Sequence, residues 1–219
     1  VMEYCSNGTI YKKGCLSNEK FVFYAKQILE TIAYCHSNKI THNEIIPNKI
    51  YIDQNDIIKI ADFGPAKSET NLNSLIFHPP EAILNEEICP YKADIWALGI
   101  TFFFMATGHY PFKSDNIEEL KQMIVKNKLN FYKYKIHPKI RFLISKMTAK
   151  NKSIRLSANE LLKLPIFSEN INHKKAFNNQ KRRKLSYLKV KSPKILNCCP
   201  NEARNVLKKV SFNPKIEIN

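Results

Sequence analysis

The sequence predicts a mainly helical domain with one small β-hairpin, an α+β arrangement in which helices dominate. Apolar residues recur every three or four positions over long stretches, which is the period of an α-helix. Strand-like alternation is confined to two short runs, IYI at 50–52 and IIKI at 57–60. With 44% hydrophobic residues in 219 positions, the chain can bury a sizeable core.

The longest amphipathic stretch is NEKFVFYAKQILETIAYCHS, residues 18–37. Its apolar positions share one face of a helix, so that face should be buried against the core. Ser17 precedes the stretch and has the side chain of a helix N-cap. The expected core positions of this helix are Phe21, Tyr24, Ala25, Ile28, Leu29 and Ile32.

The two strand-like runs flank DQND at 53–56, a turn-forming sequence, so they should pair as a hairpin. A polar stretch over residues 65–80 follows, and it contains the adjacent prolines Pro79 and Pro80. Polarity and proline together predict a loop there. A strand end is also expected at VMEYC, residues 1–5.

The stretch ADIWALGITFFFMATG, residues 93–108, is apolar on nearly every side. A helix of that kind is usually buried all round, so it should form the centre of the domain. Three surface helices are predicted beyond it, at residues 116–127, 137–149 and 157–167. Ser157 should cap the last of them, because Glu160 follows three residues on as in a capping box.

The net charge of +16 is unevenly distributed along the chain. Residues 169–219 hold 13 Lys and Arg against three Asp and Glu, whereas the preceding part holds 22 against 16. Three interpretations of this basic tail stay open: a solvated, flexible extension, a signal at KRRKLSYL (181–188), or a nucleic-acid-binding segment at residues 174–194. The signal would serve nuclear import or present Ser186 to a basophilic kinase. Aromatic residues are sparse in the tail, which disfavours base stacking.

Cysteine usage and hydropathy bear on the cellular compartment of the protein and on whether it meets a membrane. None of the six cysteines forms a C-x-x-C pair, so reduced thiols in the cytoplasm or nucleus are expected. The longest apolar run has 13 residues, too short to span a bilayer, so no membrane is expected as a partner. The chain begins with Val1, as if cut from something longer.

Five short motifs and one arginine follow one another along the chain. They are ITHNEIIPNKIYID (40–53), DFG (62–64), FHPPEA (77–82), DIWALG (94–99), GHYPF (108–112) and Arg155. In this order the chain resembles the C-terminal lobe of a eukaryotic Ser/Thr protein kinase, nearest the calmodulin- and AMP-activated-like branch. The resemblance implies a hinge remnant at 1–8, the lobe at 9–167, a basic tail at 168–219, and no N-lobe in this chain.

The resemblance places substitutions at the residues that would work on phosphate. Glu44 stands in place of the catalytic Asp, and its extra methylene displaces the carboxylate by roughly 1 Å. Lys49 replaces the Asn that binds the second Mg²⁺, and an ammonium cannot coordinate that ion. Ile46 replaces a lysine that touches the transferred phosphate, and Asn43 replaces the arginine that reads an activation-loop phosphate. Asp62 keeps the other metal position.

ATP and Mg²⁺ are the cofactors that the resemblance implies. Met2, Glu3 and Cys5 of the hinge and Tyr51 beneath the adenine would form a half-site for the nucleotide. Tyr51 replaces the usual aliphatic residue, so its ring would either fill the space or turn away. Asp62 has the alternative of a local hydrogen-bonding role without metal.

Other residues keep the pattern that folds the lobe. His42 and Phe63 match an internal hydrophobic spine, and Asp94 should tie the central helix to the catalytic-loop backbone. Glu81 and Arg155 should form a buried ion pair. The chain therefore combines an intact scaffold with altered chemistry.

Three hypotheses of function follow. The first is a catalytically impaired pseudokinase that serves as a binding or scaffolding module for a protein partner. The second is an active Ser/Thr kinase with Glu44 as base and Asp62 as metal ligand. The third is a nuclear or nucleic-acid-associated module led by the tail.

Overall fold

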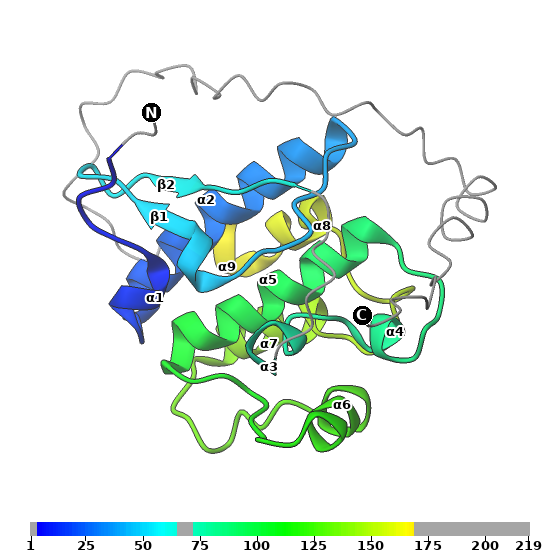
Figure 1. Cartoon of the computed structure of the whole chain (residues 1–219). Coiled ribbons are helices and arrows are strands. Elements are labelled where there is room, and N and C mark those ends of the chain that lie inside the picture. Colours follow the sequence, from blue (N-terminus) through cyan, green and yellow to red (C-terminus); the bar gives the residue numbers. More distant parts are fainter. Residues whose placement is uncertain (1–3, 65–71, 169–219) are drawn as a thin grey trace, which may run out of the picture. The chain divides into compact units, whose positions relative to one another are not determined.

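The computed structural model describes residues 4–64 and 72–168; Met2, Glu3 and the basic tail beyond Ser168 lie outside them. Helices predominate in the described part, as predicted (Figure 1). The helices are α1 (Ile10–Lys13), α2 (Asn18–Ser37), α3 (Leu72–Leu75), α4 (Pro80–Ile83), α5 (Pro90–Thr107), α6 (Ile117–Lys126), α7 (Pro138–Met147), α8 (Ala158–Leu162) and α9 (Pro165–Ser168), with a 3₁₀ turn η1 at Pro47–Lys49. The strands are β1 (Ile50–Ile52) and β2 (Ile58–Ile60).

The predicted hairpin is confirmed. Strands β1 and β2 pair antiparallel, with Tyr51 opposite Lys59. Asp53 closes the turn, because its Oδ1 accepts the backbone N–H groups of Asn55 at 2.8 Å and Ile57 at 2.9 Å. The hairpin therefore carries the loop before β1 and the segment after β2 to the same end of the sheet.

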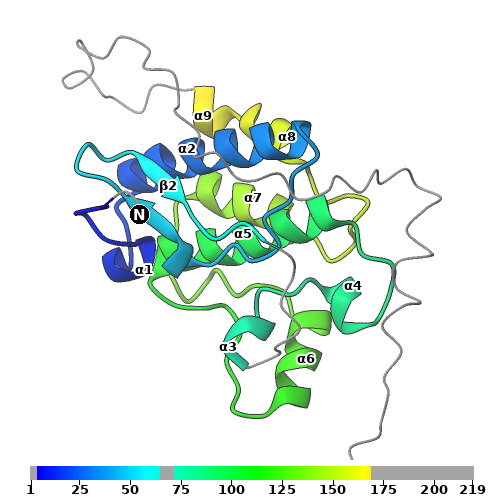
Figure 2. The ribbon, with the colours of Figure 1, turned by 45° about the horizontal axis from the view of Figure 1, so that its top comes forward.

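The core lies between two long helices that run side by side, α2 and α5 (Figures 1 and 2). Ser17 caps α2 as predicted, since its side chain accepts the backbone N–H of Lys20. Helix α5 is buried on nearly every side, which matches its all-round apolar sequence. Its buried residues include Ile95, Trp96, Leu98, Ile100, Phe102, Phe103 and Met105.

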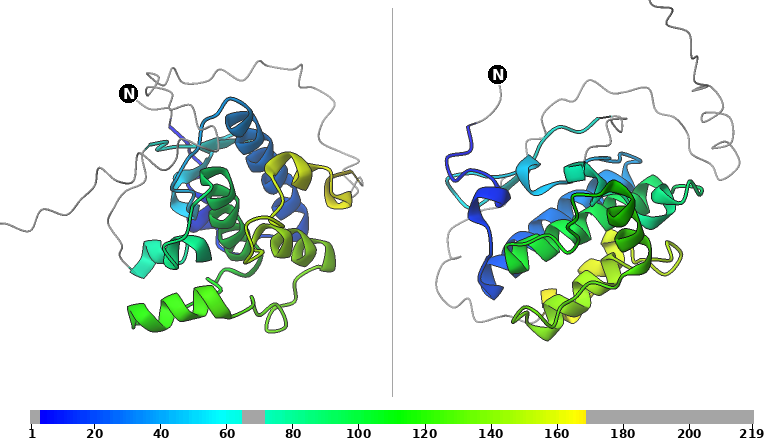
Figure 3. Two further views of the ribbon diagram at one scale, coloured as in Figure 1. Left: turned by 90° about the vertical axis from the view of Figure 1, so that its right-hand side faces the viewer. Right: turned by 60° about the horizontal axis from the view of Figure 1, so that its bottom comes forward.

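Helices α5 and α7 pack closely at Gly99. An added Cβ on Gly99 would lie 2.6 Å from Cγ2 of Thr148 and 2.9 Å from Cβ of Met147. On the other side of α5, helix α6 lies against the short helices α3 and α4 (Figure 3). Helix α5 is thus covered by helices on two sides.

Two loop and helix predictions were wrong. Within residues 65–80, α3 is helical, and α4 begins at Pro80 because proline at the first helical position already has the required φ. The helix predicted over residues 157–167 is two helices. Pro165 begins α9, because proline lacks an N–H group and its ring clashes with the preceding turn.

The N-terminal segment differs from the prediction. Tyr4 and Cys5, the described part of the expected strand end, are not in a strand, and the short helix α1 was not predicted. The capping box of Ser157 and Glu160 is confirmed. In the part of the chain that the structure describes, no helix combines the length and apolarity needed to cross a bilayer.

Candidate functional site

The loop before β1 is held by one buried carboxylate on α5. Oδ2 of Asp94 accepts the backbone N–H of His42 at 2.8 Å, and Oδ1 accepts that of Asn43 at 2.8 Å. His36, near the end of α2, lies 3.0 Å from Oδ2 through its Nε2. The sequence indicated Asp94 but not His36, which carries no local signal for a contact 58 residues away.

His42 is an interior histidine that links the loop to the segment after β2. Its Nε2 lies 2.9 Å from the carbonyl oxygen of Ala61, and its Nδ1 accepts the backbone N–H of Glu44 at 3.3 Å. Nε2 must therefore carry the proton. Burial lowers the pKa of His42, although the Asp94 carboxylate and the Ala61 carbonyl act in the opposite direction. The ring centroid of Phe63 lies 4.4 Å away, the contact expected for the spine.

Asn43 connects the two loops directly. Its φ of +67° lies in the left-handed region, which asparagine tolerates better than most residues. Its Nδ2 donates to the carbonyl oxygen of Gly64 at 2.8 Å. An arginine at this position would offer a charged group to a distant phosphate, whereas Asn43 uses its amide to hold the backbone after Phe63.

Glu44 and Lys49 form an ion pair. Nζ of Lys49 lies 2.5 Å from Oε2 of Glu44, and the two side chains are 12% and 30% exposed. The positive group at one substituted position is thus bound to the negative group at the other. The carboxylate that would accept a hydroxyl proton is already occupied by an ammonium.

Asp62 lies beside this pair but does not join it. The carbonyl oxygen of Lys49 accepts the N–H of Ala61 at 3.0 Å, which places Asp62 next to Lys49 along the hairpin. Asp62 is exposed, has a φ of +64°, and makes no hydrogen bond or ion pair with any described residue. The local capping role has no contact to support it.

The expected adenine half-site is described only in part. Ile50 and Ile52 face the core, so Tyr51 between them faces the other side of the hairpin. Cys5 lies near β1, because the next residues pair with it: the N–H of Asn7 donates to Ile52 at 3.2 Å.

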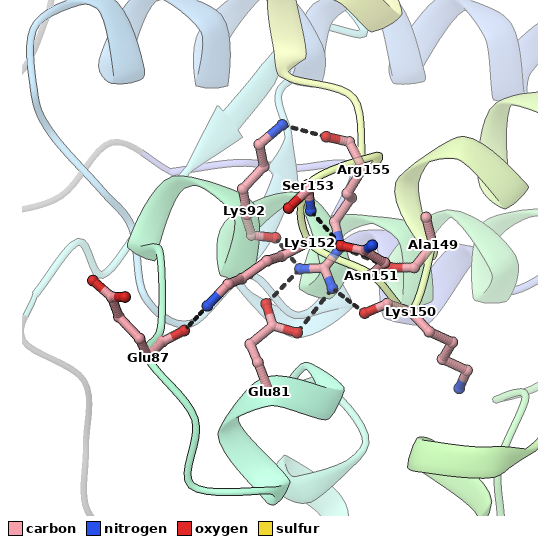
Figure 4. A network of polar contacts seen from close by, with 9 residues as sticks. All are labelled: Glu81, Glu87, Lys92, Ala149, Lys150, Asn151, Lys152, Ser153 and Arg155. Atoms are coloured by element: carbon pink, nitrogen blue, oxygen red, sulfur yellow. Dashed lines mark hydrogen bonds and ion pairs between the residues drawn. The ribbon is translucent and has the colours of Figure 1, made fainter. Parts of the chain in front are cut away.

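Glu81 and Arg155 form the buried ion pair expected from the sequence (Figure 4). Both guanidinium NH groups bind the carboxylate, at 2.8 and 2.9 Å. Arg155 also donates to the carbonyl oxygens of Ala149 at 3.1 Å, Lys92 at 2.8 Å and Lys150 at 3.5 Å. One fully buried side chain therefore joins α4, α5 and the loop after α7.

Lys150 was not singled out by the sequence, yet its ammonium is enclosed. Nζ lies 5.0 Å from the ring centroid of Trp96 and 5.1 Å from that of Phe112, and it donates to the carbonyl oxygen of Ile124. Burial, together with the charge of Arg155, lowers the pKa of Lys150 to about 8. Two ring faces and a carbonyl oxygen hold this ammonium, and it forms no ion pair with a described residue.

Sequence comparison identifies the scaffold that these contacts form. The protein kinase domain family matches residues 1–167, three quarters of the chain. The chain belongs to the protein kinase domain family. The expectation that this chain lacks an N-lobe stays a prediction, since the match to the kinase domain begins at residue 1.

Several Ser/Thr kinases are similar to this kinase domain. The probable serine/threonine-protein kinase HSL1 of Saccharomyces cerevisiae is 33% identical over 181 residues, and MARK-A of Dictyostelium discoideum, also a probable serine/threonine-protein kinase, is 30% identical over 217. The alignments cover 77% and 94% of this chain but only 12% and 19% of those proteins. The chain therefore spans less than a fifth of either relative.

A solved structure shows the same fold. The Rad53 kinase domain and SCD2 in complex with AMPPNP superimposes with a TM-score of 0.68 at 25% identity, over 77% of this chain and 68% of that one. AMPPNP is a nucleotide analogue, so that neighbour carries a bound nucleotide.

The kinase residues present here fit the cofactors poorly. Asp62 offers an exposed carboxylate for one Mg²⁺, but Lys49 brings an ammonium where a second ion would need oxygen ligands. Ile46 offers no charge to a phosphate. The side chains therefore do not fit a two-metal nucleotide site.

Proposed function

We propose that this kinase domain is a catalytically impaired pseudokinase of the calmodulin- and AMP-activated-like branch, and that it acts as a binding module for a protein partner. One observation carries the proposal: the 2.5 Å ion pair between Glu44 and Lys49. The residue at the position of the proton acceptor is bound to the residue at the position of a metal ligand. Each substitution therefore neutralises the charge of the other.

The rest of the site supports the same function. The contacts of Asp94 and of Glu81 with Arg155 maintain the lobe, while Asn43 and Ile46 supply no cation to a phosphate. Loss of one positioned phosphate contact typically costs about 10²–10³ in rate. A site that keeps its backbone and loses its cations is suited to binding rather than to phosphoryl transfer.

Phosphoryl transfer by the protein at its full natural length tests the proposal. We expect radiolabel from [γ-³²P]ATP with Mg²⁺ on neither the protein nor a general substrate such as myelin basic protein, beyond the level of the Asp62→Ala variant. Label that is present in the wild type and lost in Asp62→Ala would overturn it. Circular dichroism of both proteins controls for folding.

An active Ser/Thr kinase is the second candidate, and the exposure of Asp62 favours it. Its carboxylate is exposed and forms no hydrogen bond or ion pair with a described residue, so it is available to bind one ion. In that case, ATP with Mg²⁺ should raise the melting temperature of the full-length wild type but not that of Asp62→Ala. Equal melting temperatures with and without ATP and Mg²⁺ would remove this candidate.

A further inference from the structure

The positive charge of the folded domain is concentrated in one segment. Residues 121–155 hold eleven Lys and Arg and no Asp or Glu, whereas residues 1–120 hold ten against fifteen. The segment consists of most of α6, the loop after it, α7 and the following turn. In Figure 1, α6 lies at the lower edge of the domain, away from the hairpin and the loops that it carries.

Four cations of this segment form what we call the basic face. Its members are Lys133 and Lys135 of the loop and Arg141 and Lys146 of α7. All are exposed or half-buried, and none forms an ion pair with the residues that the structure describes. The loop and α7 contribute to one surface, because Arg141 of α7 lies over the ring of Tyr132 in the loop.

Aromatic rings hold several of these cations in place. Cζ of Arg141 lies 5.6 Å from the ring centroid of Tyr132, and Nζ of Lys146 lies 5.0 Å from that of Phe142. These rings are 91% and 49% exposed, so the pairs stand at the surface. Ring contacts restrict the side-chain rotamers, which lowers the entropy cost of binding an anion.

Arg141 has unused hydrogen-bonding capacity. Its Nε is buried and has no hydrogen-bond partner among the described residues. A guanidinium presents its N–H groups as a planar fork that matches a carboxylate. The buried Nε is out of reach of another molecule, but Arg141 as a whole is half-buried and forms no ion pair with a described residue, so the rest of its fork is suited to bind a carboxylate of a partner.

We propose that the basic face binds an extended, acid-rich segment of a partner protein. Unpaired cations on a loop and an adjoining helix complement a run of Asp and Glu side chains. Single-stranded nucleic acid fits less well, because base stacking needs free ring faces and cations already lie over these rings. An anionic membrane fits less well, because Phe142 and Ile154 are the only large apolar side chains besides Tyr132 that are exposed among the described residues 121–155, too few for a face that inserts into lipid.

This proposal names the partner class for the binding module proposed above. It does not depend on whether the site transfers phosphate, so phosphoryl transfer by the wild type would leave it intact. Conversely, failure of the basic face to bind acidic peptide would leave the Glu44–Lys49 argument unchanged. The two proposals are thus tested by separate measurements.

Fluorescence anisotropy of a fluorescein-labelled peptide of Glu, Asp and Ser, titrated with the full chain, tests the basic face. We expect Lys133→Gln/Lys135→Gln/Arg141→Gln to raise the dissociation constant roughly tenfold at low salt, as expected for three surface ion pairs. The matched control changes three exposed lysines elsewhere on the fold by the same charge, as Lys13→Gln/Lys26→Gln/Lys39→Gln. This control variant should raise the dissociation constant of the peptide less than about twofold.

Two further variants separate this surface from general attraction. Tyr132→Ser changes no charge but frees Arg141, and we expect about a threefold loss of affinity. The tail variant Lys181→Gln/Arg182→Gln/Arg183→Gln/Lys184→Gln should raise the dissociation constant of the peptide less than the basic-face variant does. The proposal is overturned if the matched control or the tail variant loses as much affinity for the peptide as the basic-face variant does. It is equally overturned if Tyr132→Ser binds the peptide as tightly as wild type. It is also overturned if oligo(dT) or phosphatidylserine vesicles bind this face more tightly than the peptide.

Discussion

Gly99 on α5 and Thr148 at the end of α7 lie so close that no side chain fits between them. A Cβ at Gly99 would be 2.6 Å from Cγ2 of Thr148, below the separation that real Cβ atoms show. Protein interiors are packed like crystals, so one helix would have to move. The central buried helix thus depends on the absence of a single methyl group.

Gly99→Ala should therefore destabilise the domain by about 1–3 kcal/mol, the usual range for overpacking. Urea denaturation of the full chain, followed by circular dichroism, measures this change. Gly64→Ala serves as the control, because an added Cβ there meets nothing within 4 Å. Equal stability of Gly99→Ala and wild type would show that α5 and α7 can separate at no cost.

Arg155→Leu should destabilise the domain by about 3–5 kcal/mol, because it leaves Glu81 as an uncompensated buried charge. The same denaturation experiment applies. Lys20→Met breaks the exposed pair with Asp56 and should cost less than about 1 kcal/mol. If the two variants lose similar stability, the buried pair is not the anchor that its geometry indicates.

Lys150 predicts a pH dependence of stability. Its pKa in the folded state is about 8, below the value of about 10.4 for an unfolded chain. Between these values the unfolded state binds more protons, so this group makes the free energy of unfolding rise with pH. We expect wild type to gain stability relative to Lys150→Met between pH 7.5 and 9.5. Parallel profiles for the two proteins would contradict the lowered pKa.

Lys49→Asn should create a cation site. The change removes the ammonium beside Asp62 and frees the carboxylate of Glu44, so a divalent ion meets less repulsion and gains an amide oxygen. Electron paramagnetic resonance of free Mn²⁺ should show binding at least about tenfold tighter than in wild type. Lys39→Asn is the control, since Lys39 has a φ of +60° that asparagine accommodates. Equal binding by wild type and Lys49→Asn would mean that Lys49 does not oppose a metal.

Local patterns predicted much of the fold. Helix α2 and the hairpin follow from residue spacing and turn chemistry, which need only near neighbours along the chain. The four-residue helices α1 and α4 were not predicted, because elements this short depend on tertiary contacts rather than on periodicity. The division between α8 and α9 could have been predicted, because Pro165 lies inside the stretch that was expected to form one helix.

The candidate site was predicted as a set of residues but not as a set of contacts. Motif order identified Glu44 and Lys49 as substitutions, yet their ion pair depends on side-chain conformations that the sequence does not specify. The contacts of His36 and Lys150 were not predicted, because the partners of these residues lie far along the chain. The basic face was not predicted, because the acidic residues of 1–120 offset the cations of 121–155 in the net charge of residues 1–168.

Asp94 has a consequence for how the chemistry of this loop can change. It binds the backbone N–H groups of His42 and Asn43, which every residue except proline possesses. These two contacts of Asp94 therefore do not depend on the side chains at positions 42 and 43, provided that neither is proline. Point changes at Glu44, Ile46 and Lys49 can therefore alter the chemistry that the loop carries while Asp94 still holds the backbone beside them.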